Sequence, residues 1–313
     1  QPDGSLVPTT LRAADPAARP AETVRFLEGI TAERLEAAGE MMARRAALST
    51  KSRPARSAAE ASGALRRGPG LSNTTFPSTG SPRSIVILAE YQDVKFDDKN
   101  GSIYKYDKYT EGGAHSFFSE WLMKKPFHAF GATGSANEWF AENSIGPDGI
   151  VQFDPQFDLY GPVTLSENMA YYGGNDTYGN DLRPAEMVIE ACRLLDDEVD
   201  FRQYDVDGDG VIDNVFVIYA GCGEADGGGR NTIWPHSWDI LAAGNEEVKL
   251  DGVFLNHYAC TNETNNTLRR PAGIGVFIHE FSHVLGLPDL YATNDNSRAY
   301  TPKAYSVLDK GPY

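Results

Sequence analysis

Long hydrophobic runs and cysteine are what this sequence has least of. No window approaches the about 18 continuous apolar residues that a membrane-spanning helix needs, so we expect no membrane span. The three cysteines, Cys192, Cys222 and Cys260, allow at most one internal disulfide, which excludes a disulfide-stapled scaffold. With 313 residues, 41% of them hydrophobic, the chain can still bury a sizeable core in one large or two medium domains.

Basic residues are scarce after residue 83. Residues 1–83 carry a net charge of +4 and the remainder carries −20, which gives −16 for the whole chain. An acidic body repels phosphates, so the composition argues against nucleic acid as a partner. The same charge is compatible with an extracellular, calcium-rich setting, and a solubilising acidic surface is the alternative explanation. Because the first residue is Gln1 and not Met, we expect that a signal peptide or tag has been removed.

The first 83 residues differ in kind from the rest of the chain. Pro, Ala, Arg and Ser dominate there, and a helical pattern covers Glu22–Ala47. The stretch Ser49–Arg83 is poor in hydrophobic residues and has the composition of an exposed linker. We therefore predict an N-terminal, partly helical segment with its linker at residues 1–83 and a folded domain at residues 84–313.

Strand and helix patterns alternate from residue 84 onward. Short apolar runs predict buried strands at Ile85–Tyr91 and Val215–Ala220, with Val253–Tyr258 as a candidate third. Helical periodicity predicts helices at His115–Met123, Ala136–Glu142, Glu186–Glu198 and Ile274–Leu285. This alternation predicts a mixed α/β (α+β) domain.

His279 and His283 stand four residues apart on the last predicted helix. That spacing puts both imidazoles on one face of the helix, where they can share a tetrahedral Zn²⁺. Glu280 follows the first histidine and is placed to take a proton from zinc-activated water. Two surface histidines on an ordinary helix are the alternative.

The residues after His283 extend this pattern to His-Glu-x-x-His-x-x-Gly-x-x-Asp. Gly286 allows the helix to end in a left-handed turn, which would bring Asp289 back as a third zinc ligand. Residues 284–313 contain no Glu and no His. Of the three aspartates there, Asp289 has the right offset, whereas Asp295 and Asp309 do not.

A second cluster of acidic residues precedes the strand at Val215. Its spacing matches the first three quarters of an EF-hand loop for Ca²⁺, with carboxylates at positions 1, 3, 5 and 9 and a backbone ligand at position 7. These candidate calcium ligands are Asp205, Asp207, Asp209, Val211 and Asp213. Position 12 is Phe216 instead of the bidentate Glu, so we expect a rigid calcium staple and not a sensor. An acidic turn without a metal is the alternative.

The segment His279–Tyr291 resembles the M6 metallopeptidases, the immune inhibitor A-like branch of the metzincins. The likeness extends over about residues 84–313, through Phe157–Val163, Tyr204–Asp213, Val217–Gly221 and Ile233–Trp238. It implies a metzincin-like zinc protease catalytic domain with a mixed sheet and an active-site helix, secretion mostly from bacteria, and protein or peptide substrates. By the same resemblance, His279, His283 and Asp289 would be zinc ligands and Glu280 the general base.

Two features depart from the family pattern. The methionine turn of metzincins corresponds to Tyr305–Gly311, where Leu308 replaces the methionine. Leu and Met have similar volumes, so we expect a hydrophobic floor under the zinc to be retained. Family members usually continue beyond the position of Tyr313, so we expect this chain to be a truncated or processed form.

The basic N-terminal segment ahead of an acidic protease domain suggests a zymogen. In this hypothesis residues 1–83 inhibit the enzyme until cleavage at Arg66, Arg67 or Arg83, and a leader with no inhibitory role is the alternative. A cysteine switch is excluded because the first cysteine is Cys192, which leaves an acid such as Asp3 or Asp15 to cap the zinc. The alternative function is a calcium-dependent binding or adhesion module with a zinc site that is weak or inactive in catalysis.

The remaining histidines carry no ligand spacing. His236 and His257 lie among aromatic residues, and a lone histidine in such surroundings is more often packed and hydrogen-bonded than a metal ligand. We therefore expect both to be structural.

Overall fold

The computed structural model describes most of the chain from residue 76 onward. The described residues are 76–96, 109, 112–177, 179–265, 270–287, 289–290, 302 and 305–309. The predicted helix Glu22–Ala47 and the candidate cleavage and capping residues before residue 76 lie outside them. Within the described residues, no helix combines the length and the apolar character that crossing a membrane requires.

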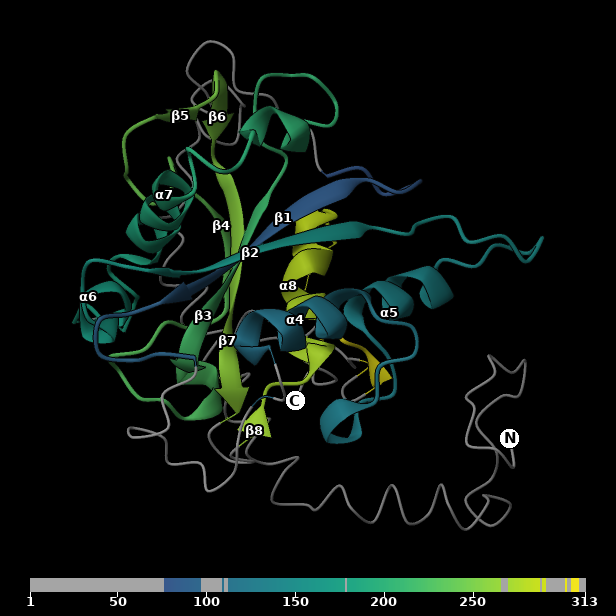
Figure 1. The fold of residues 1–313 in the computed structure, drawn as a ribbon, viewed down its shortest axis with the longest axis horizontal. Coiled ribbons are helices and arrows are strands. Elements are labelled where there is room, and N and C mark those ends of the chain that lie inside the picture. The colour runs from purple at the N-terminus through teal and green to yellow at the C-terminus, as the bar shows by residue number, and fades with distance from the viewer. Residues whose placement is uncertain are drawn as a thin grey trace. The chain divides into compact units, whose positions relative to one another are not determined.

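A mixed sheet forms the centre of the described structure (Figure 1). Its strands follow the order β2 (Gln156–Thr164), β1 (Arg83–Glu90), β3 (Val215–Cys222), β7 (His257–Asn265) and β4 (His236–Asp239), with β8 (Arg270–Pro271) paired to β7. The first four strands in this order are parallel, and β4 runs antiparallel to β7. The predicted mixed sheet is therefore confirmed.

The two predicted strands of the sheet centre, β1 and β3, are buried on both faces. Ile85 and Ile87 of β1 belong to one hydrophobic cluster, and Val86 and Leu88 belong to the cluster on the opposite face. Since both faces are covered, the strand carries a continuous apolar run instead of an alternating one. The candidate strand Val253–Tyr258 is divided: β6 (Val253–Leu255) pairs with β5 (Val248–Leu250), and β7 begins at His257.

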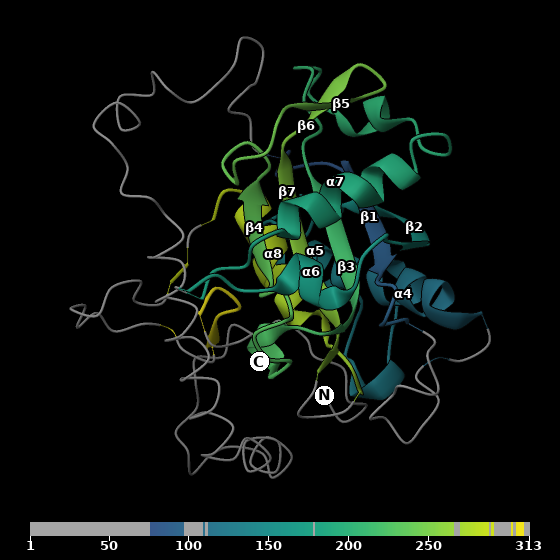
Figure 2. The same cartoon turned by 90° about the vertical axis from the view of Figure 1, so that its left-hand side faces the viewer.

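Helices cover both faces of the sheet (Figures 1 and 2). One layer contains α6 (Met169–Gly173) and α7 (Pro184–Leu194), and the other contains α4 (Gly113–Met123), α5 (Ala136–Asn143) and α8 (Ile274–Val284). The predictions for α4, α5 and α8 are confirmed to within two residues at each end.

The predicted helix Glu186–Glu198 is shifted in the structure. It begins at Pro184, because proline suits the first turn of a helix, and it ends at Leu194. Three acidic residues follow at 196–198, where they would face the negative end of the helix dipole. The helix therefore stops before them.

Aromatic side chains hold α8 against the sheet. Phe277 packs on Phe216 of β3 with ring centroids 4.3 Å apart, and Phe281 packs on Phe157 of β2 at 5.1 Å. Phe76, which is 2% exposed, adds an edge contact to Phe281 at 5.2 Å. Because Phe277 and Phe281 occupy one side of the helix, the residues between them are directed to other sides.

Candidate metal centres

Helix α8 ends as its sequence predicts. Gly286 has φ +84°, the left-handed conformation that glycine adopts without strain. Its N–H donates to the carbonyl of His283 at 2.9 Å, and the N–H of Leu287 donates to the carbonyl of Ser282 at 3.0 Å. This pair of bonds is a Schellman motif, and it reverses the chain immediately after the second histidine.

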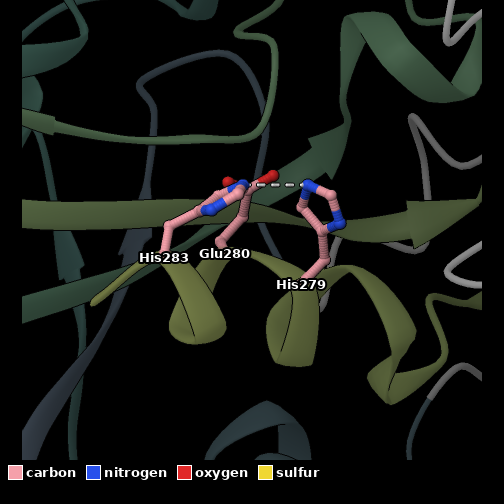
Figure 3. A group of neighbouring side chains, drawn as sticks. All are labelled: His279, Glu280 and His283. Carbon is pink, nitrogen blue, oxygen red and sulfur yellow. Dashed lines mark hydrogen bonds between the residues drawn. The ribbon is translucent and has the colours of Figure 1, made fainter. Parts of the chain in front are cut away.

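Two nitrogen atoms and one oxygen atom converge beside α8. The two Nε2 atoms of His279 and His283 lie 3.2 Å apart, and both side chains project from the same side of the helix (Figure 3). Oδ1 of Asp289 lies 3.3 Å from Nε2 of His279 and 3.2 Å from Nε2 of His283. The structure thus brings together the three residues that the sequence singles out as zinc ligands.

The hydrogen bonds on the far side of each ring decide which nitrogens carry lone pairs. Nδ1 of His279 donates to the carbonyl of Val307 at 2.6 Å, and Nδ1 of His283 donates to the carbonyl of Leu287 at 2.8 Å. In the neutral imidazoles the proton is then on Nδ1, so both Nε2 atoms present lone pairs to each other and to Asp289. Such a triangle of acceptors needs a cation, or an extra proton, at its centre.

The size of that triangle fits zinc. Ligands placed tetrahedrally at about 2.0 Å from Zn²⁺ stand about 3.3 Å from one another. The three observed separations are 3.2, 3.2 and 3.3 Å. Three protein ligands would also leave the fourth tetrahedral position open, as catalytic zinc sites require.

Burial of the site is uneven. His279 and Glu280 are fully buried, whereas the side chains of His283 and Asp289 are 18% and 20% exposed. Burial lowers the pKa of His283, but the hydrogen bond to Asp289 and the charge of Glu280 outweigh it and raise the pKa above its ordinary value of 6.5. A cation at this place is therefore favoured by two carboxylates.

Glu280 lies beside the triangle. One of its carboxylate oxygens and one ring nitrogen each of His279 and His283 all lie within 4.8 Å of one another. At that distance its carboxylate can reach a water molecule held between the imidazoles, which is the geometry that a general base needs.

The turn at residues 306–309 contacts the site through its backbone. Leu308, the residue expected in the place of the methionine, is 9% exposed, and its carbonyl accepts a hydrogen bond from the N–H of Leu290 at 2.8 Å. Its neighbour Val307 supplies the carbonyl that orients His279. No signal in the sequence predicts this role of Val307 or that of Leu287, because every residue has a backbone carbonyl and no side chain marks these two.

The acidic loop is also assembled by the fold. The carboxylates of Asp205, Asp207 and Asp209 lie within 4.8 Å of one another. Oxygens of this loop accept backbone N–H groups, among them Asp205 from Gly210 at 3.0 Å and Asp213 from Val206 at 2.7 Å. Burial, together with the charges of Asp207, Asp205 and Asp209, raises the pKa of Asp213 to about 7, although the Val206 N–H lowers it. Crowded negative charge of this kind is what a bound divalent cation relieves.

The residues around the acidic loop agree with a staple and not with a sensor. Phe216, at the twelfth loop position, lies buried in β3, so the loop leads into a strand instead of a second helix. The carbonyl of Gly210 accepts from the N–H of Phe254, which ties the loop to β6. Asp200, which precedes the loop, accepts two hydrogen bonds from the Arg202 guanidinium at 2.8 and 2.9 Å.

His236 and His257 both have hydrogen-bond partners within the fold. His236 donates from Nδ1 to the carbonyl of Trp234 at 2.6 Å, and its Nε2 accepts from the hydroxyl of Tyr258 at 2.9 Å. His257 lies 2.6 Å from a carboxylate oxygen of Asp239. The three cysteines are free thiols, so the single disulfide that their number permits is not formed.

A sheet flanked by helices, with paired histidines and a glutamate on one helix and an aspartate in the segment after it, defines a metallopeptidase catalytic domain. Residues 77–313 match the family described as immune inhibitor A peptidase M6, catalytic domain. The chain belongs to this family.

Two relatives indicate how far the likeness extends. The pre-pro-metalloprotease PrtV of Vibrio cholerae serotype O1 is 26% identical over 250 residues, which cover 72% of this chain and 24% of PrtV. Immune inhibitor A of Bacillus thuringiensis subsp. alesti is 27% identical over 263 residues, which cover 73% of this chain and 36% of that protein. The chain thus spans about a quarter to a third of the length of these relatives.

Proposed function

We propose that this chain is a zinc-dependent endopeptidase in which His279, His283 and Asp289 hold the metal and Glu280 is the general base. The observation that carries the proposal is the triangle of acceptor atoms 3.2–3.3 Å apart, with each imidazole held in the zinc-binding tautomer by a backbone carbonyl. Membership of a metallopeptidase family supports the same interpretation.

Zinc bound by these residues would supply Lewis acidity, which lowers the pKa of water and polarises the carbonyl of the scissile peptide bond. Glu280 would accept the proton of the attacking water and deliver it to the nitrogen of the leaving amine. Its burial keeps its carboxylate away from bulk water, which strengthens its electrostatic interaction with the reacting groups. His279 and His283 would hold their orientation through the carbonyls of Val307 and Leu287.

The acidic loop is proposed to bind structural Ca²⁺ through Asp205, Asp207, Asp209, the carbonyl of Val211 and Asp213. The crowding of its carboxylates and the raised pKa of Asp213 support this assignment. A cation there would tie the start of β3 to β6.

Secretion and activation from a zymogen are part of the proposal. Both relatives come from bacteria, and one of them is named a pre-pro-metalloprotease. Of the three candidate cleavage sites, Arg83 is the least suited, because it is the first residue of β1 and its side chain donates to Asp158 at 2.8 Å and to Gln203 at 2.6 Å. We therefore favour cleavage at Arg66 or Arg67, with residues 1–83 as the source of the inhibitory segment.

A comparison of Glu280→Ala with the wild type on casein tests the function. The variant is expected to keep its zinc, measured by metal analysis, and to lose proteolysis by several orders of magnitude, while 1,10-phenanthroline abolishes wild-type activity. Glu142→Ala, at an exposed glutamate near the end of α5, is the matched control. Equal, chelator-insensitive signals from Glu280→Ala and the wild type would reject the protease and favour the calcium-dependent binding module.

A further inference from the structure

A further group of oxygen atoms that could bind a metal lies between α6 and α7, apart from the candidate zinc and calcium centres described above. Asn175 and Asp181 pair across an antiparallel bridge, which closes a turn. The N–H of Asp176 donates to the carbonyl of Asn180 at 2.9 Å. Residues opposed in such a bridge direct their side chains to the same side, so Asn175 and Asp181 are neighbours there.

This turn lies directly against the loop that follows β3. Nδ2 of Asn175 donates to Oε2 of Glu224 at 3.0 Å, and Oδ2 of Asp181 accepts the N–H of Trp234 at 2.8 Å. Glu224 is 3% exposed. At Gly173 a Cβ atom would come within 2.6–2.8 Å of the backbone of Thr232 and Ile233, so here the two segments touch backbone to backbone.

Among the described residues, no hydrogen-bond donor reaches several buried oxygens of the turn. They are Oδ1 of Asn175, Oδ1 of Asn180 and Oδ1 of Asp181. Buried polar atoms are almost always satisfied by protein, water or an ion, so three orphaned acceptors within seven residues require an explanation. The amide assignments cannot be exchanged freely, because Nδ2 of Asn175 and Nδ2 of Asn180 already donate to carboxylates.

The pKa of Asp181 also indicates that negative charge is crowded at this turn. Burial, followed by the charges of Glu224 and Asp176, raises the pKa of Asp181 well above 3.8, although the Trp234 N–H lowers it. Among the described residues, no Lys, Arg or His side chain forms an ion pair with Asp181. Negative charge and orphaned oxygens are therefore concentrated at one buried place.

We propose that Asp181, Glu224 and Asn175 bind a divalent cation, Ca²⁺, between the turn 175–181 and the loop after β3. The donors are carboxylate and amide oxygens with no imidazole or thiolate, which is the ligand set of calcium and not of zinc. The two carboxylates balance the charge of the cation, and Ca²⁺ accepts the irregular arrangement that separate loops provide. Backbone carbonyls and water complete the six to eight ligands that calcium takes.

The cation would stabilise the segment that leads into β4. Asp181 already holds the N–H of Trp234, two residues before β4 begins at His236, and the N–H of Glu224 donates to the carbonyl of Ile233 at 3.0 Å. Strand β4 is an edge of the sheet and contacts α8. A bound ion therefore fixes the edge strand beside the active-site helix.

The competing explanation for the buried carboxylate is that Asp181 is protonated and binds no metal. The substitution Asp181→Asn distinguishes this explanation from calcium binding. If Asp181 is a buried, protonated acid, Asp181→Asn keeps the side chain uncharged. The melting temperature then stays equal or rises at every calcium concentration. If Asp181 is a calcium ligand, Asp181→Asn removes one bound calcium ion and lowers the melting temperature in calcium but not in EGTA.

Calcium titration of the full chain by calorimetry, together with melting temperatures, tests the proposal. Asp181→Asn and Glu224→Gln are each expected to bind one calcium ion fewer than the wild type and to keep the stoichiometric zinc. Asp207→Asn removes the ion of the loop 205–213 and is expected to leave this second ion bound. Asp196→Asn, at an exposed carboxylate just after α7, is the matched control and should bind as the wild type does.

The proposal is overturned if Asp181→Asn and Glu224→Gln retain every calcium ion that the wild type binds. Asn175→Asp keeps the proposal testable where both of these variants fail to fold. It adds a carboxylate to the same group and is expected to tighten calcium binding at least tenfold. Unchanged or weaker binding by a folded Asn175→Asp variant would then exclude the site.

Discussion

The imidazole of His279 donates its Nδ1 proton to the backbone carbonyl of Val307, 2.6 Å away and 28 residues further along the chain. A partner of this kind fixes the tautomer and the direction of a metal-binding histidine. The carbonyl is held in place by a turn whose central side chain, Leu308, is buried. Packing under the turn is thus linked to the geometry of the proposed metal site.

Truncation of Leu308 should therefore weaken zinc binding. Leu308→Ala leaves a cavity under the turn and loosens the Val307 carbonyl, so we expect zinc affinity to fall by roughly 10–100-fold, as for losses of outer partners in other zinc sites. Leu308→Met conserves the volume and should bind zinc as the wild type does. Competition with a chelator of known affinity measures both variants, and wild-type affinity in Leu308→Ala would exclude the link.

The third ligand can be tested against another aspartate of the same region. Asp289→Ala removes the oxygen that lies 3.2–3.3 Å from both imidazole nitrogens, so the purified variant should contain much less than one zinc ion per chain. Asp295→Ala is the control and should keep its zinc. If Asp295→Ala loses the metal and Asp289→Ala retains it, the ligand assignment is wrong.

Calcium removal should destabilise the chain without removing zinc. A ligand at about 100 times its Kd adds about 2.7 kcal/mol to the free energy of unfolding for each site, so EGTA is expected to lower the melting temperature while metal analysis still finds zinc. Asp207→Asn should reduce the calcium-dependent part of that shift, because Asp207 belongs to the crowded carboxylates of the acidic loop. An identical shift in this variant would remove the loop from the set of calcium sites.

The stability of the described domain should depend on Phe76. Phe76→Ala removes a ring that is 2% exposed and packs on Phe281 of α8, so the free energy of unfolding should fall by about 3–5 kcal/mol. Leu194→Ala, at a residue of α7 that is 51% exposed, should change it by less than about 1 kcal/mol. Urea unfolding measures both, and equal effects of the two variants would show that Phe76 contributes nothing specific.

The three thiols should differ in reactivity. Burial raises the pKa of Cys192 far above its ordinary value, which leaves almost no thiolate at neutral pH, and Cys260 is fully buried. Cys222 is half-buried at the end of β3. A thiol reagent should therefore modify one cysteine in the native chain and three after denaturation, and rapid modification of Cys192 in the native state would contradict this.

Strands β2 and β4, which the sequence did not predict, lack a local signature. Strand β2 contains Gly161 and Pro162, which are typical of turns, and β4 is a short, half-buried edge of mixed polarity. Each is a strand because a neighbour, β1 or β7, offers it hydrogen-bonding partners. Pairing of this kind depends on the sheet and not on the residues of the strand alone.

The sequence itself determined helix α8, with its two histidines and the turn at Gly286. Helical spacing and a glycine at the helix end are local signals that span only a few residues. The buried strands β1 and β3 were determined in the same way by their continuous apolar runs. Only the tertiary structure decided which carbonyls orient the histidines, that Phe76 packs beneath α8, and that Asn175, Asp181 and Glu224 meet. These contacts join segments that are far apart in the chain. Local sequence patterns do not predict such contacts, because they form only when the core packs the segments together.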